Sequence, residues 1–174
     1  MGNAVLPDIQ IVRHWLSQVP DPEIPVISLT DLGIIRGVEW QGDTLVVTVT
    51  PTYSGCPATS VINMDIEAAL RAKGIEKLRL ERQLSPPWTT DWITPEGREK
   101  LRVYGIAPPV DGTAADGRLA GRVARLAGTS NLTIACPRCG STKTEKISQF
   151  GSTPCKASYR CTDCLEPFDY FKCI

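Results

Sequence analysis

Four cysteines near the C-terminal end of the sequence are spaced as ligands for one metal ion. They form two Cys-x-x-Cys pairs, Cys136-Pro-Arg-Cys139 and Cys161-Thr-Asp-Cys164, with 21 residues between the pairs. The two-residue spacer lets both sulfurs of a pair face one point, and the intervening chain returns the second pair as a hairpin. Four thiolates with no open position are typical of a structural zinc site, so we predict zinc at these four cysteines. An iron–sulfur cluster is the alternative that the same ligands leave open.

A disulfide-linked, secreted protein is a second alternative for these cysteines. Disulfides require an oxidising compartment and therefore an entry signal. The N-terminal segment, Met1-Gly-Asn-Ala-Val-Leu-Pro7, lacks a basic region followed by an apolar run. No stretch approaches the roughly 18 apolar residues of a membrane helix. We therefore expect a cytoplasmic protein with reduced, metal-binding cysteines and no membrane partner.

The composition is that of a small globular protein. The 174 residues suffice for one domain or for one domain with a small appendage, and 42% of them are hydrophobic. The 19 basic and 19 acidic residues cancel, whereas a nucleic-acid-binding surface needs a basic excess. We therefore expect no nucleic-acid partner, although zinc ribbons often occur in nucleic-acid-binding proteins. The single histidine, His14, excludes a site built on a histidine cluster.

Cys56 is the strongest candidate for chemistry outside the paired cysteines. It lies between Gly55 and Pro57, directly before an amphipathic segment, and Pro57 suits the first helical position. We therefore expect Cys56 to cap that helix, where free backbone amides and the positive end of the helix dipole favour a thiolate. The alternative is a small buried residue at a tight turn. A nucleophilic enzyme is disfavoured, because the sulfur would need a neighbouring base.

Three acidic residues are candidates to add carboxylates near this thiol: Asp21, Glu23 and Asp31. Their alternative role is to cap turns, as an aspartate beside a proline commonly does. Two further cysteines, Cys155 and Cys173, stay unassigned. Each could replace one of the paired cysteines as a metal ligand, or could pack as an apolar residue in the metal-binding module. We favour the two pairs as the ligands, because their spacing alone supplies a complete tetrahedral set.

Hydrophobic periodicity predicts the elements that must position these residues. Apolar residues at helical spacing predict helices over residues 8–19 and about 57–73. Thr94 as a cap, Pro95 in the first turn and Gly105 as a stop predict a third helix over 95–104. Alternation of apolar and polar residues predicts a hairpin of strands over 34–41 and 44–50, and a third strand at 78–80.

The predicted fold class is α+β, with two domains joined by a linker. The three helices and three strands form a domain over residues 1–106, and residues 132–174 form a mostly β, zinc-ribbon-like module. Residues 107–131 are rich in Ala, Gly and Pro and are predicted to be a linker, in which residues 119–126 could form a short docked helix. The module is too small to fold without its ion, so we expect chelation to unfold it and to spare residues 1–106.

The first domain resembles a known family in three motifs. These are Asp21-Pro-Glu23, then Asp31-Leu-Gly33 followed by two apolar residues, then Gly55-Cys56-Pro57 after a hairpin. Their order and spacing are similar to the signature of the iron–sulfur assembly domain of SufT-like proteins and cytosolic cluster-targeting factors. The resemblance implies that Cys56 handles iron or a cluster transiently, and that the three acidic residues shape its surroundings.

The chain as a whole, with its cysteine-rich end, resembles the PaaD family of the bacterial phenylacetyl-CoA epoxidase system. The resemblance implies an accessory, non-enzymatic protein of aerobic phenylacetate degradation that matures or inserts a metal centre. Oxygenation in such systems belongs to a di-iron subunit fed by a reductase with flavin and an iron–sulfur cluster, so these subunits are the implied partners. The sequence contains no Glu-x-x-His pair of a di-iron bundle, which agrees with an accessory role.

A docking subunit is the alternative function. In that case the zinc ribbon and Trp88 or Trp92 would only bind the oxygenase or reductase, and Cys56 would be dispensable. A nucleic-acid-binding ribbon is a weaker alternative, because the charges of the chain cancel.

Overall fold

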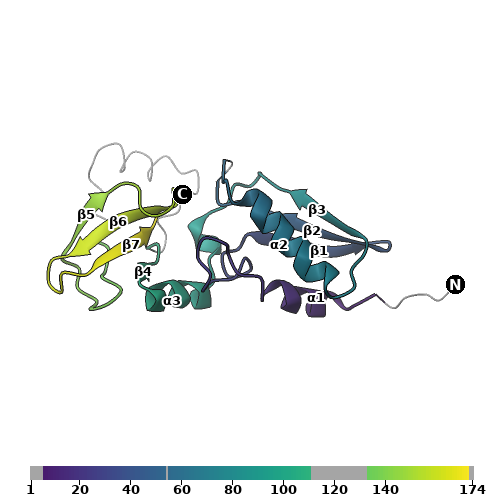
Figure 1. The fold of residues 1–174 in the computed structure, drawn as a ribbon, viewed down its shortest axis with the longest axis horizontal. Helices are drawn as coiled ribbons and strands as arrows, with labels where there is room; N and C mark the ends of the chain where they lie inside the picture. Colours follow the sequence, from purple (N-terminus) through teal and green to yellow (C-terminus); the bar gives the residue numbers. More distant parts are fainter. Residues whose placement is uncertain (1–5, 54, 111–132, 173–174) are drawn as a thin grey trace. The chain divides into compact units, whose positions relative to one another are not determined.

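The computed structural model describes residues 6–53, 55–110 and 133–172 (Figure 1). These residues contain three α-helices and seven β-strands in two sheets, so the predicted α+β class is confirmed. The chain divides into two compact units, Met1–Trp88 and Thr89–Ile174, and each unit contains one of the sheets. No helix in the described part of the chain is long and apolar enough to cross a membrane.

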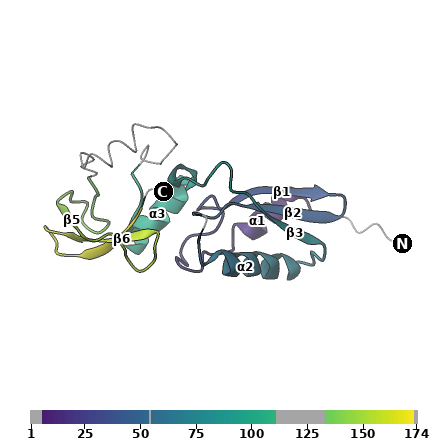
Figure 2. The same ribbon diagram turned by 90° about the horizontal axis from the view of Figure 1, so that it is seen from above.

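The first unit is built on a three-stranded sheet in the order β1-β2-β3. Strands β1 (Ile35–Gln41) and β2 (Thr44–Val49) are antiparallel, and β3 (Leu78–Arg82) is parallel to β2. Parallel neighbours need a crossover connection, which α2 (Thr59–Arg71) provides, while α1 (Ile9–Leu16) precedes the sheet in the chain. Figure 2 shows α2 along one face of this sheet.

The buried face of the first unit follows the two periodicities of the sequence. Helix α2 buries Ile62, Ile66 and Leu70, which are spaced four residues apart. Strand β2 buries the alternating Leu45 and Val47, both 0% exposed, and also Val46, which is 1% exposed and points to the opposite face of this central strand. Full burial of one such side chain contributes about 1.5–3 kcal/mol, so these residues stabilise the packing of α2 on the sheet.

The second unit is built on a four-stranded sheet in the order β4-β7-β6-β5. Strands β5 (Thr144–Ser148), β6 (Lys156–Cys161) and β7 (Pro167–Phe171) form an antiparallel meander, and the two-residue β4 (Ile106–Ala107) lies parallel to β7. Helix α3 (Pro95–Tyr104) leads directly into β4. The core cluster of this unit includes two of the paired cysteines, and its members are Ala107, Ile134, Cys136, Cys161, Phe168 and Tyr170.

Helix α3 begins and ends at the residues that the sequence predicts. The Thr94 side chain accepts a hydrogen bond from the Gly97 amide at 3.0 Å, and Pro95 occupies the first turn. Gly105 ends the helix with a φ of 100°, a left-handed conformation that suits glycine. The prediction of a helix over residues 95–104 is therefore confirmed.

The structure divides the chain between Trp88 and Thr89, earlier than the predicted domain boundary after residue 106. Helix α3 belongs to the second unit, because β4 pairs with β7 of the cysteine-rich module, with Ile106 opposite Asp169. The predicted linker therefore begins within a strand. Its residues 111–132, including the helix suggested over 119–126, lie outside the described residues.

Candidate metal centre and candidate thiol site

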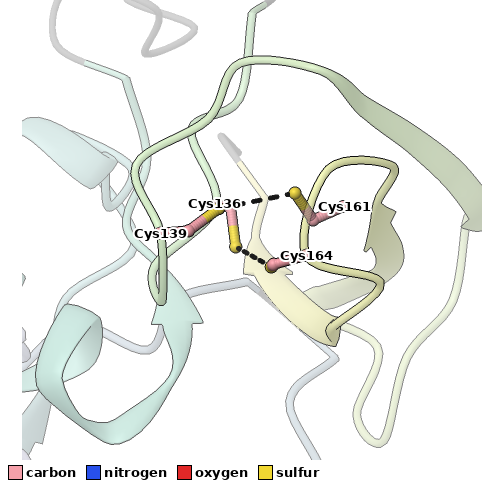
Figure 3. Close-up of side chains that lie close together, drawn as sticks. All are labelled: Cys136, Cys139, Cys161 and Cys164. Carbon is pink, nitrogen blue, oxygen red and sulfur yellow. Dashed lines mark hydrogen bonds between the residues drawn. The ribbon is translucent and has the colours of Figure 1, made fainter.

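The four paired cysteines of the second unit converge on one point (Figure 3). Their sulfur atoms all lie within 4.8 Å of one another. The Sγ atoms of Cys136 and Cys164 are 3.7 Å apart, and those of Cys139 and Cys161 are 3.6 Å apart. Each of these close approaches joins one pair to the other, so the two loops share a single site.

These distances fit one tetrahedral ion. Four sulfurs at about 2.3 Å from a central zinc lie about 3.8 Å from one another, close to the separations in this site. An iron–sulfur cluster places several iron atoms between its thiolates, so some of its cysteine sulfurs must lie further apart than those around a single ion. The donor chemistry and the close spacing together therefore fit a mononuclear metal site, and the chain has a metal-binding module.

The two cysteine loops share one backbone design. The residue after the second cysteine of each pair has a positive φ, 74° at Gly140 and 64° at Leu165. The next residue of each loop, Ser141 or Glu166, then donates its backbone N–H to the sulfur of that second cysteine. Such donors orient the thiolates and stabilise their charge before and after an ion binds.

Hydrogen bonds and crowding separate the pKa values of the four thiols. The backbone N–H groups of Cys164 and Asp163 lower the pKa of Cys161 to about 7. The Glu166 N–H favours the Cys164 thiolate, yet the Cys139 thiol, burial and the other thiols raise the pKa of Cys164 to about 12. Four thiolates so close together therefore require the charge of a bound cation.

Polar contacts tie the two cysteine loops together at the surface. The Asp163 carboxylate accepts hydrogen bonds from Ser141 Oγ at 2.6 Å and Lys143 Nζ at 3.2 Å, and both contacts lower the pKa of Asp163. Arg138 Nε lies 3.5 Å from a carboxylate oxygen of Glu166. Each contact joins the first loop to the second, so both support the convergence of the four sulfurs.

Cys155 and Cys173 remain apart from this description. Cys155 is buried, its Sγ lies 3.0 Å from Thr153 Oγ1, and it is not a member of the four-cysteine group. Cys173 lies outside the described residues. The structure therefore assembles the two pairs without Cys155, as the spacing of the pairs predicts.

Cys56 lies in a turn before α2, and the expectation that it caps this helix is wrong. The helix begins at Thr59, with Ala58 at the cap position. The Cys56 carbonyl accepts hydrogen bonds from the Thr59 N–H at 3.3 Å and from Thr59 Oγ1 at 2.9 Å. The turn that these bonds close delays the helix by two residues relative to the predicted start at residue 57. The half-buried thiol of Cys56 is thus on the loop rather than on the first turn.

Two of the acidic candidates have the turn-forming role that the sequence left open. Asp21 is 7% exposed, and its Oδ1 accepts hydrogen bonds from the backbone N–H groups of Glu23 at 2.9 Å and Ile24 at 2.8 Å. Asp31 Oδ2 accepts from the Ser28 N–H at 3.3 Å, while Ser28 Oγ accepts from the Asp31 N–H at 3.0 Å. These bonds fix the loop that carries the half-buried Glu23.

The candidate residues of the first unit do not form a ready-made metal centre. In residues 6–53, 55–110 and 133–172, the four paired cysteines are the one group of three or more potential ligands close enough to share an ion. Cys56, Asp21, Glu23 and Asp31 are therefore not brought together as a ligand set. Iron or a cluster bound at Cys56 would need its other ligands from groups that arrive with it or from a partner protein.

Thr50 is a candidate that sequence reasoning does not find. It is 1% exposed at the end of β2, and its hydroxyl is one of three buried threonine hydroxyls without a hydrogen-bond partner in the described residues. Leaving such a group unsatisfied costs about 1–3 kcal/mol. The following residues lead to Cys56, so this polar group belongs to the same segment as the thiol. A threonine in an alternating strand gives no sequence signal of this kind.

Comparisons with known proteins match both units. Residues 9–77 match the family described as iron-sulfur cluster assembly protein, and residues 121–172 match the PaaD zinc beta ribbon domain. A protein of Escherichia coli strain K12, provisionally named as the D component of 1,2-phenylacetyl-CoA epoxidase, is 49% identical over 168 residues, covering 97% of this chain and 94% of the relative. An Fe-S protein maturation auxiliary factor of Porphyromonas gingivalis is 33% identical over 103 residues, covering 58% of this chain and 97% of that protein. The crystal structure of a Bacillus anthracis domain of unknown function is 23% identical, with a TM-score of 0.49 over 53% of this chain and 90% of that chain.

Proposed function

Because the chain belongs to the PaaD family of the 1,2-phenylacetyl-CoA epoxidase system, we propose that it is an accessory protein of aerobic phenylacetate degradation. In this proposal it matures or inserts the iron–sulfur or other metal centre of the epoxidase system, and the reductase cluster is the recipient. The observation that carries the proposal is the pairing, in one chain, of an iron–sulfur-assembly unit with a separate four-cysteine metal site.

The proposal gives the two units different roles. Cys136, Cys139, Cys161 and Cys164 hold one zinc ion, which stabilises the second unit and supplies no redox chemistry. Cys56 provides a thiolate to an iron or cluster cargo. Asp21 and Asp31 hold the loop over residues 21–31 in shape, and Glu23 is a further residue proposed to shape the surroundings of the thiol. A single thiol with few supporting ligands binds such cargo weakly, which suits transfer rather than storage.

The proposed compartment is the cytoplasm. All six cysteines of the described residues are free, which suits a reducing environment. The proposal requires these thiols to stay reduced, because an oxidised cysteine ligates neither zinc nor a cluster.

The experiment compares wild type with Cys56→Ala in maturing the reductase subunit under exclusion of air. We expect the reductase matured with Cys56→Ala to contain much less iron and sulfide than with wild type, while circular dichroism shows an unchanged fold. Ser60→Ala, an exposed change in the first turn of α2, is the control for local disturbance and is expected to match wild type. A fully loaded reductase in the presence of Cys56→Ala would contradict the proposal.

A docking subunit is a second candidate function, favoured by the lack of a preformed ligand set around Cys56 in the described residues. Trp88 is a poor docking residue, because it is 3% exposed and its Nε1 donates to the Leu32 carbonyl at 2.8 Å. Docking would therefore rely on the second unit. Two results together would favour this function. The chain would co-purify stably with the oxygenase or reductase whether or not it carries Cys56→Ala, and the reductase would be fully loaded in the presence of this variant.

A further inference from the structure

The four-cysteine site has a buried side and an exposed side. The first cysteine of each pair is buried, with Cys136 2% and Cys161 0% exposed, and both belong to the apolar core of the second unit. The second cysteine of each pair, Cys139 or Cys164, is exposed. Each buried sulfur lies within 3.7 Å of the exposed sulfur of the other pair, so a bound ion would lie between the core and the surface.

The buried and the exposed cysteines are held in place by different kinds of contact. The buried cysteines are held by the packing of Ile134, Phe168 and Tyr170, so moving either sulfur disturbs the core. The exposed cysteines are held by their own loops, through the backbone N–H groups of Ser141 and Glu166. Surface loops open locally at a much lower free-energy cost than a packed core.

We propose that the ion in this site is exchangeable through Cys139 and Cys164. The four-cysteine site would then both stabilise the fold of the second unit and exchange its metal ion. With an ion held by the four cysteines, a donor atom of an incoming ligand would bind it from the exposed side, and the bond from the ion to Cys139 Sγ or Cys164 Sγ would break. The released thiolate takes a proton from water, and no electron is transferred. The two buried sulfurs keep the ion in place until the incoming ligand has completed its own coordination.

This inference does not depend on the proposed function of Cys56. It concerns only the second unit, and it predicts exchange with any strong zinc ligand, whether or not a reductase is present. A purely structural ribbon would release its ion only when the whole unit unfolds. The two cases differ in their kinetics, because attack by a ligand depends on the ligand concentration and unfolding does not.

The first test measures zinc release from the zinc-loaded full chain to the coloured chelator 4-(2-pyridylazo)resorcinol. We expect the release rate to rise in proportion to the chelator concentration, while the circular dichroism of the chain outlasts the early phase of release. A release rate that does not change with chelator concentration and equals the unfolding rate of the second unit would overturn the proposal.

The second test compares single serine substitutions on the two sides. Cys139→Ser is expected to keep the fold and one zinc ion, and to release zinc about tenfold faster or more, since even loss of an outer-shell partner weakens metal sites by about 10–100-fold. Cys136→Ser is expected to lose the fold of the second unit. Thr142→Ala, an exposed change beside the first loop, is the control and should behave as wild type. Release from Cys139→Ser no faster than from wild type would contradict the proposal.

Discussion

At the residue scale, the two cysteine loops show how the same turn is built with and without glycine. Gly140 and Leu165 occupy equivalent positions after the second cysteine of each pair, and both have positive φ. A left-handed conformation costs a residue other than glycine roughly 1–2 kcal/mol. Leu165 is 68% exposed, so burial of its side chain offsets little of this cost. Cys164 directly before Leu165, and the Glu166 N–H directly after it that binds the Cys164 sulfur, hold the turn in its strained form.

This comparison predicts opposite effects of two substitutions. Leu165→Gly is expected to raise the free energy of unfolding of the zinc-loaded second unit by about 0.5–1 kcal/mol, because glycine adopts positive φ without strain. Gly140→Ala is expected to lower it by about 1 kcal/mol through the backbone alone, since no atom lies within 4 Å of the added Cβ. Urea denaturation of the zinc-loaded chain measures both. A loss of stability in Leu165→Gly would show that the leucine side chain makes a stabilising contact.

At the element scale, a buried charge pair joins β6 and β7 to the loop between β5 and β6. Lys156 is 5% exposed, and its Nζ lies 3.7 Å from Asp169 Oδ2. The same carboxylate accepts hydrogen bonds from Ser152 Oγ at 2.9 Å and from Ser158 Oγ at 3.5 Å. Gly151 passes so close that an added Cβ would lie 2.8 Å from Asp169 Oδ1. One carboxylate therefore fixes the loop against the sheet.

Removal of this carboxylate is expected to destabilise the second unit strongly. Asp169→Asn leaves the Lys156 ammonium buried without its counter-charge, at a cost of about 2 kcal/mol, below the 3–5 kcal/mol of a fully buried pair because Asp169 is partly exposed. Glu145→Gln is the control, since Glu145 and Arg160 form an exposed pair at 2.8 Å, whose loss costs at most about 1 kcal/mol. Thermal and urea unfolding compare the two variants. Equal stability of the two variants would contradict the assigned role of Asp169.

At the scale of the whole molecule, the unit that contains the four-cysteine site extends beyond the cysteine-rich end of the chain. Strand β4 pairs with β7, and Arg98 donates hydrogen bonds to the carbonyls of Pro109 at 2.6 Å and Thr90 at 2.9 Å. The Arg138 guanidinium, on the first cysteine loop, packs against Gly105 at the end of α3. The segment that contains α3 thus belongs to the same packed unit as the four-cysteine site, and we expect it to depend on a bound ion as well.

Chelation of the metal is therefore expected to unfold residues 89–110 together with 133–172, and to spare residues 6–53 and 55–88. The sequence alone predicts that residues 89–106 are spared as well, so the two expectations differ at α3. Amide hydrogen exchange of the zinc-loaded and chelated chain measures the difference, with β2 of the first unit as the internal control. Protection of α3 that survives complete chelation would contradict the expectation drawn from the structure.

The features that could be predicted without a structure are those that depend on local spacing along the chain. The two-residue spacers place each pair of thiols, the apolar periodicity of residues 57–73 predicts α2, and the capping residues Thr94, Pro95 and Gly105 predict α3. Each of these signals depends on the geometry of a few adjacent residues. The three motifs of the first domain also identified its family before any fold was known.

The grouping of segments into units follows from contacts between residues far apart in the chain, which local spacing does not predict. The pairing of Ile106 with Asp169 joins residues far apart in the chain, and a two-residue strand has no periodicity of its own. The start of α2 at Thr59 depends on a turn around Cys56, and the burial of the Thr50 hydroxyl depends on packing from other elements. The burial of Cys136 and the exposure of Cys139 likewise follow from the core that forms on one side of the site. Spacing selects the ligands, but long-range packing determines which of them an incoming molecule can reach.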